Sequence, residues 1–194
     1  MTYITAQTAT TQLQAVNNVL SVIGEAPLAS LENVTSLDAS AAITELSTAM
    51  LEVMTSGYWF NTIRVTASPN DDGEIALPIT YLTIKPVDPR DLYILKGGRL
   101  YDVRNNTYQI SSPVELRVSV QLDWEDLPQQ ARTYIQDRAG RIYAQKQVGE
   151  KTMVLAAAQD ERMSLAELQN ENLRQLRVTR LDNYDIAAGF RLWR

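Results

Sequence analysis

The first quarter of the chain carries apolar residues at helical spacing. A stripe of four such residues predicts a helix over residues 8–23. The stripe consists of Leu13, Val16, Leu20 and Ile23. Gly24 is typical of the left-handed position that ends a helix, and Pro27 prevents the helix from resuming. With Glu25 between them, these two residues predict a sharp corner after the first helix.

A second helical pattern follows over residues 36–56. Either Ser36 or Asp38 can cap the first free backbone amides of this helix, and Gly57 is expected to end it. Its apolar stripe consists of Ala42, Ile43, Leu46, Met50, Val53 and Met54. The chain is therefore expected to start with two consecutive helices.

After the second helix the pattern favours strands. Residues 58–66 are aromatic and β-branched, residues 69–73 indicate a turn, and residues 74–84 contain further extended pieces. Gly97 and Gly98 can supply the positive φ angles that a two-residue hairpin turn requires. This part of the chain is therefore predicted to be rich in hairpins.

The clearest strand pattern covers residues 114–122, where apolar and polar residues alternate. The apolar set Val114, Leu116, Val118, Val120 and Leu122 alternates with the polar set Glu115, Arg117, Ser119 and Gln121. We expect one buried face and one solvent-exposed face.

Helical spacing returns in the last third. One helix is predicted over residues 128–148, with Pro128 in its first turn and Gly149 at its end. Its apolar face consists of Ala131, Ile135, Ala139 and Ile142. A longer helix is predicted over residues 150–180, with the thin stripe Leu155, Ala158, Leu165, Leu168 and Leu176. A helix this polar cannot bury much against its own domain, so we expect it to project or to pack against another chain.

The last segment, residues 181–194, has no clean period but is rich in aromatic residues and arginine. The side chains that could anchor it to a partner are Tyr184, Ile186, Phe190, Arg191, Leu192, Trp193 and Arg194. Disordered tails are poor in aromatic residues. We interpret the segment as a docking tail, the alternative being an arm that folds back on its own domain.

Together these elements predict an α+β protein, mainly α, with a four-helix bundle-like domain and an inserted β-rich region. We expect an N-terminal helical part over residues 1–57 and the insertion over residues 58–124. A C-terminal helical part over residues 125–180 should pack with the first, followed by the docking tail.

Composition removes several classes of chemistry. The 194 residues include no cysteine and no histidine, which excludes disulfides, thiolate catalysis, Ser-His-Asp triads and histidine-ligated zinc. No apolar run approaches the ~20 residues that span a bilayer. Residues 1–5 lack the basic and apolar regions of a signal peptide. We therefore expect no cofactor, no metal and no membrane contact, and maturation in a cytoplasm.

The net charge of −5 is unevenly distributed. Residues 1–80 contain one basic side chain, Arg64, against eight acidic ones, so the remainder of the chain is slightly basic. Solvated acidic helix faces would explain this asymmetry. Alternatively, one part of the molecule faces the oppositely charged part of a neighbour.

Two groups of carboxylates could support the hydrolysis of glycosidic bonds, which needs two acids across a substrate. The first is Asp71 with Asp72, and the second is Asp123 with Glu125 and Asp126. A turn explains the first group, and the preference of acids for a helix start explains the second. A hydrolase that cleaves polysaccharide through such a carboxylate pair is the alternative function, and a protein without enzymatic activity the favoured one.

Other candidate sites have structural explanations. Residues 96–99 and 149–152 lack the spacing of a phosphate-binding loop. Arg174, Arg177 and Arg180 could contact nucleic acid, but a pI of about 4.8 argues against a dedicated nucleic-acid binder. The sequence thus favours an assembly component over an enzyme.

The opening segment resembles the start of tail tubular protein A, the family of head-to-tail adaptors of short-tailed bacteriophages. The matching residues are Ala15, Val16, Asn17, Leu20, Ile23, Gly24, Glu25, Pro27 and Leu31. The family's Gly-Trp-x-Phe-Asn motif is similar to residues 57–61, although here Tyr58 takes the tryptophan position and Trp59 follows, before Phe60 and Asn61. A similar hairpin motif continues the order at Gly97, Gly98, Tyr101 and Asp102.

The resemblance covers almost the whole chain and implies a structural virion protein assembled in the host cytoplasm. Twelve copies would form a ring between the portal protein and the tail nozzle, a protein like tail tubular protein B. DNA would leave through the ring without specific binding. The four helices would build the wall, residues 58–122 would face the nozzle, and residues 181–194 would dock on the portal.

Overall fold

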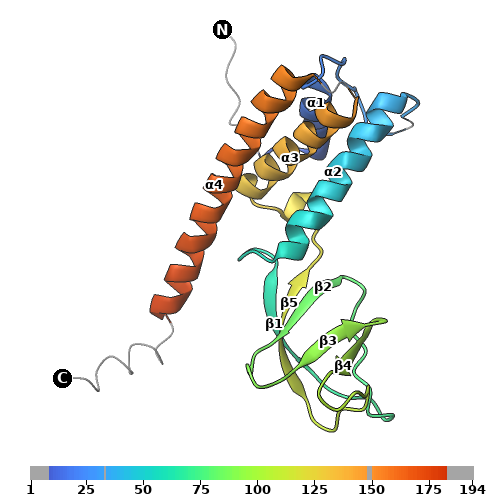
Figure 1. The fold of residues 1–194 in the computed structure, drawn as a ribbon, viewed down its shortest axis with the longest axis vertical. Coiled ribbons are helices and arrows are strands. Elements are labelled where there is room, and N and C mark those ends of the chain that lie inside the picture. Colours follow the sequence, from blue (N-terminus) through green and yellow to red (C-terminus); the bar gives the residue numbers. More distant parts are fainter. Residues whose placement is uncertain (1–8, 33, 148–149, 183–194) are drawn as a thin grey trace, which may run out of the picture. The chain divides into compact units, whose positions relative to one another are not determined.

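A computed structural model describes residues 9–32, 34–147 and 150–182 of the protein. The chain divides into two compact units, one formed by Met1–Met50 and Asp123–Arg194 and the other by Leu51–Leu122. The described residues form long helices and small antiparallel sheets (Figure 1). The prediction of a mixed, mainly helical protein is therefore confirmed.

The first unit is helical. It contains α1 (Gln12–Ser21), most of α2 (Leu37–Ser56), the 3₁₀ helix η1 (Trp124–Asp126), α3 (Gln129–Gln147) and α4 (Lys151–Asp182).

Helix α1 begins at Gln12, later than the apolar spacing indicates, because Thr11 caps it. The Thr11 hydroxyl accepts a hydrogen bond from the Gln14 amide, and the Gln14 side chain accepts one from the Thr11 amide. This reciprocal pair satisfies amides that a helix start leaves free. The boundary therefore follows the local hydrogen bonds and not the hydrophobic period.

Helix α2 is capped by Ser36, whose hydroxyl accepts a hydrogen bond from the Ala39 amide at 3.4 Å. The helix ends at Gly57, which has a φ of +74°, so the predicted end is confirmed. Its buried face consists of Ala39, Ala42, Leu46, Ala49, Val53 and Met54. Ile43 and Met50, which the apolar stripe includes, are only partly buried.

Helices α1 and α3 pack closely against each other. Gly140 permits the approach, because a Cβ atom at this position would lie 3.1 Å from Cγ2 of Val22. The buried side chains of the two helices include Val16, Val19, Leu20, Ala131, Ile135 and Ala139. Burial of each large aliphatic side chain contributes about 1.5–3 kcal/mol, so this contact organises the helical unit.

A buried arginine stabilises the start of α3 through hydrogen bonds to the backbone. The Arg132 guanidinium donates to the carbonyl oxygens of Leu127, Thr10 and Glu125 at 2.7–2.8 Å. The indole of Trp124 also donates to the Thr10 carbonyl, at 2.8 Å. These bonds tie the segment before α1 to the chain that leads into α3.

The apolar face predicted for α3 is partly wrong. Tyr143 and Ala144 are fully buried, whereas Ile142 is only partly buried. The Tyr143 hydroxyl reaches the Asp38 carbonyl of α2 at 3.1 Å, which explains how a polar-tipped ring can be buried there. Gly149, predicted to end this helix, lies outside the described residues.

The apolar stripe predicted for α4 is also partly wrong. The buried positions are Ala157, Ser164 and Leu168, while Leu155 and Leu176 are 70% and 47% exposed. Only Leu168 of the predicted stripe is fully buried, because the face that meets α3 is rotated from the apolar stripe. The part of α4 from Ala157 to Leu168 nevertheless packs on α3, so this part of the helix does not project alone.

The second unit consists of two small antiparallel sheets. β1 (Thr62–Ala67), β5 (Val114–Val120) and β2 (Tyr81–Pro86) form one sheet in the order β1-β5-β2. β3 (Tyr93–Lys96) and β4 (Arg99–Asp102) form the predicted hairpin. Its turn residues Gly97 and Gly98 have φ angles of +62° and +73°. The core consists of Ile75, Leu77, Leu100, Ile110, Val114, Leu116 and Val118.

One residue departs from the alternation predicted for β5. Ser119 belongs to the polar set but is only 7% exposed. A Cβ atom on Gly57 would lie 2.5 Å from Oγ of Ser119, so the two residues are in close contact. The short serine side chain is buried because the chain after α2 passes directly over it.

Candidate assembly site

The first motif corner, around Gly24, is built by backbone geometry and one asparagine. Gly24 has a φ of +80°, its amide donates to the Ser21 carbonyl and the Glu25 amide donates to the Leu20 carbonyl. This pair of bonds is the Schellman arrangement that closes a helix. Glu25 and Pro27 are exposed, which leaves them available to solvent or to a partner chain.

Asn17 holds the chain that follows this corner. Its side-chain amide donates to the Leu28 carbonyl at 3.0 Å, and its side-chain oxygen accepts from the Leu28 amide at 2.7 Å. The Asn17 side chain therefore bonds both backbone groups of Leu28, as a neighbouring strand would. Its place in the sequence motif is explained, because only a side chain with both a donor and an acceptor can make this pair.

The second motif corner joins α2 to β1 through Asn61, which is fully buried. Its side-chain oxygen accepts from the Tyr58 amide, and its side-chain nitrogen donates to the carbonyls of Met54 and Val120 at 2.8 and 2.9 Å. Three backbone segments are thus joined by one amide. The neighbouring rings of Tyr58, Trp59 and Phe60 stack or meet edge-on at 5.1–5.8 Å between centroids.

The third motif, the β3–β4 hairpin, carries a charged and aromatic surface. Lys96 lies 4.4 Å from the ring centroid of Tyr101, and Arg99 lies 4.3 Å from that of Tyr108. Arg99 also forms an ion pair with Glu74 at 2.7 Å. Cation–π contacts of this kind contribute about 0.5–1 kcal/mol at exposed sites, so they stiffen the hairpin more than they define a ligand site.

The carboxylates considered for hydrolysis do not form a reaction centre. Asp71 and Asp72 are exposed in a turn. The Asn70 side chain stabilises this turn, because its oxygen accepts hydrogen bonds from the amides of Asp72 and Glu74. Asp123, Glu125 and Asp126 are exposed around η1. The positions of both groups match their structural explanations.

A shallow depression in the second unit is lined by three other acids, Asp88, Asp91 and Glu115. Hydrogen bonds from the Arg90 side chain and amide lower the pKa of Asp88 to about 2. Asp88 therefore stays ionised and cannot act as the proton donor that glycoside hydrolysis requires. Within the described residues, no group of three or more acidic side chains is arranged to hold a metal ion.

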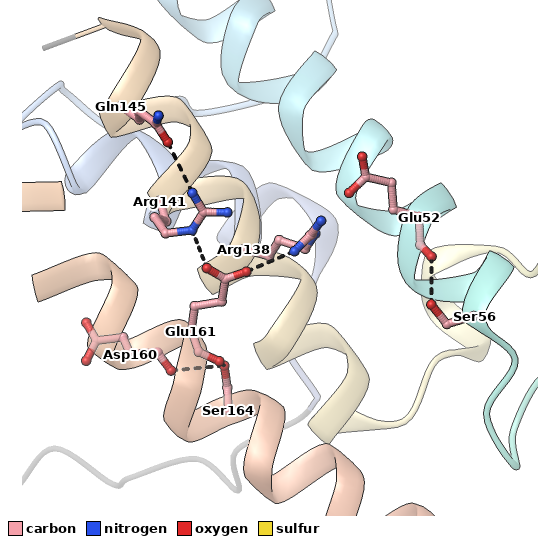
Figure 2. Close-up of polar contacts among 8 residues, drawn as sticks. All are labelled: Glu52, Ser56, Arg138, Arg141, Gln145, Asp160, Glu161 and Ser164. Atoms are coloured by element: carbon pink, nitrogen blue, oxygen red, sulfur yellow. Dashed lines mark hydrogen bonds and ion pairs between the residues drawn. The ribbon is translucent and has the colours of Figure 1, made fainter. Parts of the chain in front are cut away.

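Helices α3 and α4 are joined by an ion network in the first unit (Figure 2). Glu161 of α4 bridges Arg138 and Arg141 of α3, and the distance to Arg138 is 3.0 Å. The Glu161 side chain is only 13% exposed. Partly buried pairs with arginine forks are stronger than surface pairs, so this network fixes the position of α4 on α3.

Asp137 lies beside this network and faces the same helix. Burial is the main cause that raises its pKa, and the nearby charges of Asp160 and Glu161 raise it further. Hydrogen bonds from Ser164 and Gln136 oppose this shift. A pocket of about 230 Å³ adjoins Asp137 and Asp160, but it is open to solvent and polar. The raised pKa therefore reflects how closely α4 packs on α3.

Two helices of the described chain expose groups of large apolar side chains, and the sequence predicted a partner chain only for α4. Large apolar side chains are exposed on α4 at Leu155, Met163, Leu173 and Leu176, and on α2 at Leu37 and Leu51. Exposed apolar residues grouped on one element mark interaction sites more often than isolated ones do. Among the described helices, none is both long and apolar enough to cross a membrane.

Comparison with known proteins agrees with an assembly role. The model of the family described as "Tube: Tail tubular protein" matches residues 13–178. The chain belongs to the tail tubular protein family. It is also 29% identical over 158 residues to tail tubular protein A of Klebsiella phage KP34, across 74% of this chain and 84% of that protein. A tail tubular protein is a structural part of a phage tail, so this chain is a tail component of a virion.

The family match includes all three motif corners. The docking tail predicted for residues 181–194, with Tyr184, Ile186, Phe190, Arg191, Leu192, Trp193 and Arg194, lies beyond the match. The seven named residues also lie outside the described structure, which ends with α4 at Asp182.

Proposed function

We propose that this tail tubular protein is the head-to-tail adaptor of its virion. Twelve copies form a ring between the portal protein and the tail nozzle, around the channel through which DNA leaves. The chain has no catalytic role and needs no cofactor. Residues 58–122 face the nozzle, and residues 181–194 dock on the portal.

The observation that carries this proposal is the family match over residues 13–178, together with the likeness to a tail tubular protein A. That match runs through residues of both compact units and so does not rest on one local motif. The motif residues support it, since Asn17, Gly24, Gly57 and Asn61 all serve to join elements. These residues build a shape and perform no reaction.

The charge distribution supports a ring. In a head-to-tail ring, one surface of each subunit meets a different surface of the next, which favours opposite charges on the two. The acidic first 80 residues and the slightly basic remainder satisfy this condition. A protein with a net charge of −5 also avoids strong binding to DNA phosphates, which depends on lysine and arginine.

Electron microscopy of the purified chain mixed with its cognate portal and nozzle proteins tests the proposal. We expect a twelve-fold layer of density between the two partners. Deletion of residues 181–194 should leave a folded protein that no longer sediments with the portal but still binds the nozzle. Binding of the chain to the side of the tail, or unchanged portal binding after the deletion, contradicts the proposed arrangement.

A further inference from the structure

Helix α4 has a continuous outer stripe that no described residue of its own unit covers. Residues Leu155, Arg162, Ala166, Gln169 and Leu173 are spaced by seven, four, three and four positions, and all are exposed. The helical period of 3.6 places them on one line opposite the buried positions Ala157, Ser164 and Leu168. We name these five residues the α4 outer stripe.

The α4 outer stripe combines apolar and basic side chains. Leu155 and Leu173 are 70% and 53% exposed, and Arg162 lies between them. Between Lys151 and Leu176 the acids of this helix are Asp160, Glu161, Glu167 and Glu171, and the same period places all four away from the stripe. A partner surface should therefore lack basic residues, which would repel Arg162, and should offer apolar contacts to Leu155 and Leu173.

Helix α2 presents a surface with these properties. Leu37, Ser40, Thr44, Ser47, Thr48 and Leu51 are all exposed and lie on one side of the helix, and we name them the α2 hydroxyl face. Each hydroxyl donates to the carbonyl oxygen four residues earlier, at 2.8–3.0 Å. Because these polar groups are already satisfied, their burial under a partner costs little.

The charge of α2 also suits the α4 outer stripe. Helix α2 contains no lysine or arginine that would repel Arg162. Its acidic residues Asp38, Glu45 and Glu52 lie beside the α2 hydroxyl face, and Glu45 is paired with Lys146. A second copy of α4 would be a poorer partner, because packing two outer stripes together would bring Arg162 against its own equivalent. The complementary occupant of the stripe is therefore the α2 hydroxyl face of another copy.

The two faces point in different directions. Helix α3 contacts α4 through Arg138 and Arg141, and it contacts α2 through Tyr143 and Lys146, whose amine pairs with Glu45 at 2.6 Å. These two pairs lie on different sides of α3, and Figure 1 shows α3 between α4 and the first part of α2. Surfaces on opposite sides of a subunit give a head-to-tail contact, which closes into a ring or continues as a filament.

We infer that the α4 outer stripe of one subunit packs on the α2 hydroxyl face of a second copy. This inference deepens the proposed ring and rests on it, since it names the surfaces through which neighbouring copies meet.

Cysteine cross-linking tests the contact directly, because the chain has no cysteine of its own. Virions would be assembled with Thr44→Cys and Ala166→Cys in the same chain and treated with a short bismaleimide. We expect a ladder of covalent oligomers that extends beyond the dimer. Either single-cysteine variant should stay monomeric, and a mixture of the two should stop at the dimer.

Several outcomes would overturn the inference. Dimers from Ala166→Cys alone would show an α4–α4 contact instead, and an adduct with another virion protein would show a different occupant. Microscopy of the same virions separates the two proposals. A ring without a ladder rejects only the α2–α4 contact, whereas the absence of a ring rejects the adaptor function as well.

A charge substitution provides a matched second test. Leu155→Glu lies on the α4 outer stripe and should lower the yield of virions containing the chain at least tenfold. Ala156→Glu lies on the same helix, is also exposed and falls beside the stripe, so its yield should stay near wild type. Equal yields for the two variants contradict the assignment, and thermal unfolding of both purified proteins checks that neither change acts through folding.

Discussion

At the scale of single residues, Gly57 shows how one position in this chain satisfies two demands. Its φ of +74° is strained for any residue with a Cβ atom. Its backbone also approaches Ser119 so closely that an added Cβ atom would lie 2.5 Å from Oγ. The helix end and the contact with β5 therefore require glycine independently of each other.

The two demands can be separated by mutation. Gly57→Ala should destabilise the protein by about 2–4 kcal/mol, because backbone strain and overpacking add. Gly24→Ala has a similar φ of +80° but nothing within 4 Å of the added atom, so it should cost only about 1 kcal/mol. Urea unfolding followed by circular dichroism measures both.

A double-mutant cycle identifies the contact itself. In a Ser119→Ala background, the hydroxyl that meets the new Cβ atom is absent, so Gly57→Ala should cost close to what Gly24→Ala costs. An unchanged cost in that background would show that strain alone governs the site.

The residue scale also shows what a sequence can and cannot predict. Gly24, Gly57 and the Gly97–Gly98 turn were predictable because positive φ angles are a local property of glycine. The bonds of Asn61 were not, since one of them reaches Val120, 59 positions away along the chain. Such a contact becomes visible only when the fold brings the two segments together.

At the scale of elements, buried residues were predicted correctly where the apolar residues of a helix or strand repeat regularly and all lie on its one buried face. The alternation in β5 placed Val114, Leu116 and Val118 correctly in the core. The stripe of α4 failed because its apolar residues lie on two sides, and only the packing of α3 decides which side is buried. Ser119 departed from the alternation because another segment covers it.

The packing of α4 on α3 should depend on pH through Asp137. Its pKa is raised in the folded protein, mainly by burial, so the folded state holds a proton more tightly than the unfolded state. Stability should therefore fall as the pH rises from the ordinary value of 3.8 through the raised value, and it should stay lower above that range.

Removing the charge of Asp137 tests the predicted direction of this pH dependence. Asp137→Asn should raise the melting temperature at pH 7, and the difference from wild type should shrink toward pH 3. Asp88→Asn is the opposite control, because Arg90 lowers the pKa of Asp88 to about 2 and the ionised form is the favoured one. That exposed pair should show a small effect of opposite sign. A lower melting temperature for Asp137→Asn at pH 7 would falsify the assignment.

At the scale of the whole molecule, the architecture places all recognisable motifs at junctions between elements. The corners at Gly24 and Gly57 and the β3–β4 hairpin shape the chain, while six of the exposed large apolar side chains lie on the helices α2 and α4. An enzyme of this size would gather its polar motif residues around one pocket. In this tail tubular protein the motif residues are instead spread over three junctions, which suits a structural part of a phage tail.

The uneven charge makes a prediction about assembly as a whole. If contacts between copies join the acidic first 80 residues to the slightly basic remainder, higher salt should weaken the ring, since exposed charges are screened over about 10 Å at 0.1 M salt and about 3 Å at 1 M. Mass photometry of the assembled rings between 50 mM and 500 mM salt should show a growing fraction of smaller species, with several-fold weaker association at the higher salt. The melting temperature of the dissociated chain over the same range serves as the control, because a parallel loss of stability would attribute the change to folding. Rings that keep their size at all salt concentrations would mean that apolar contacts, such as those of Leu155 and Leu173, hold the copies together without help from charge.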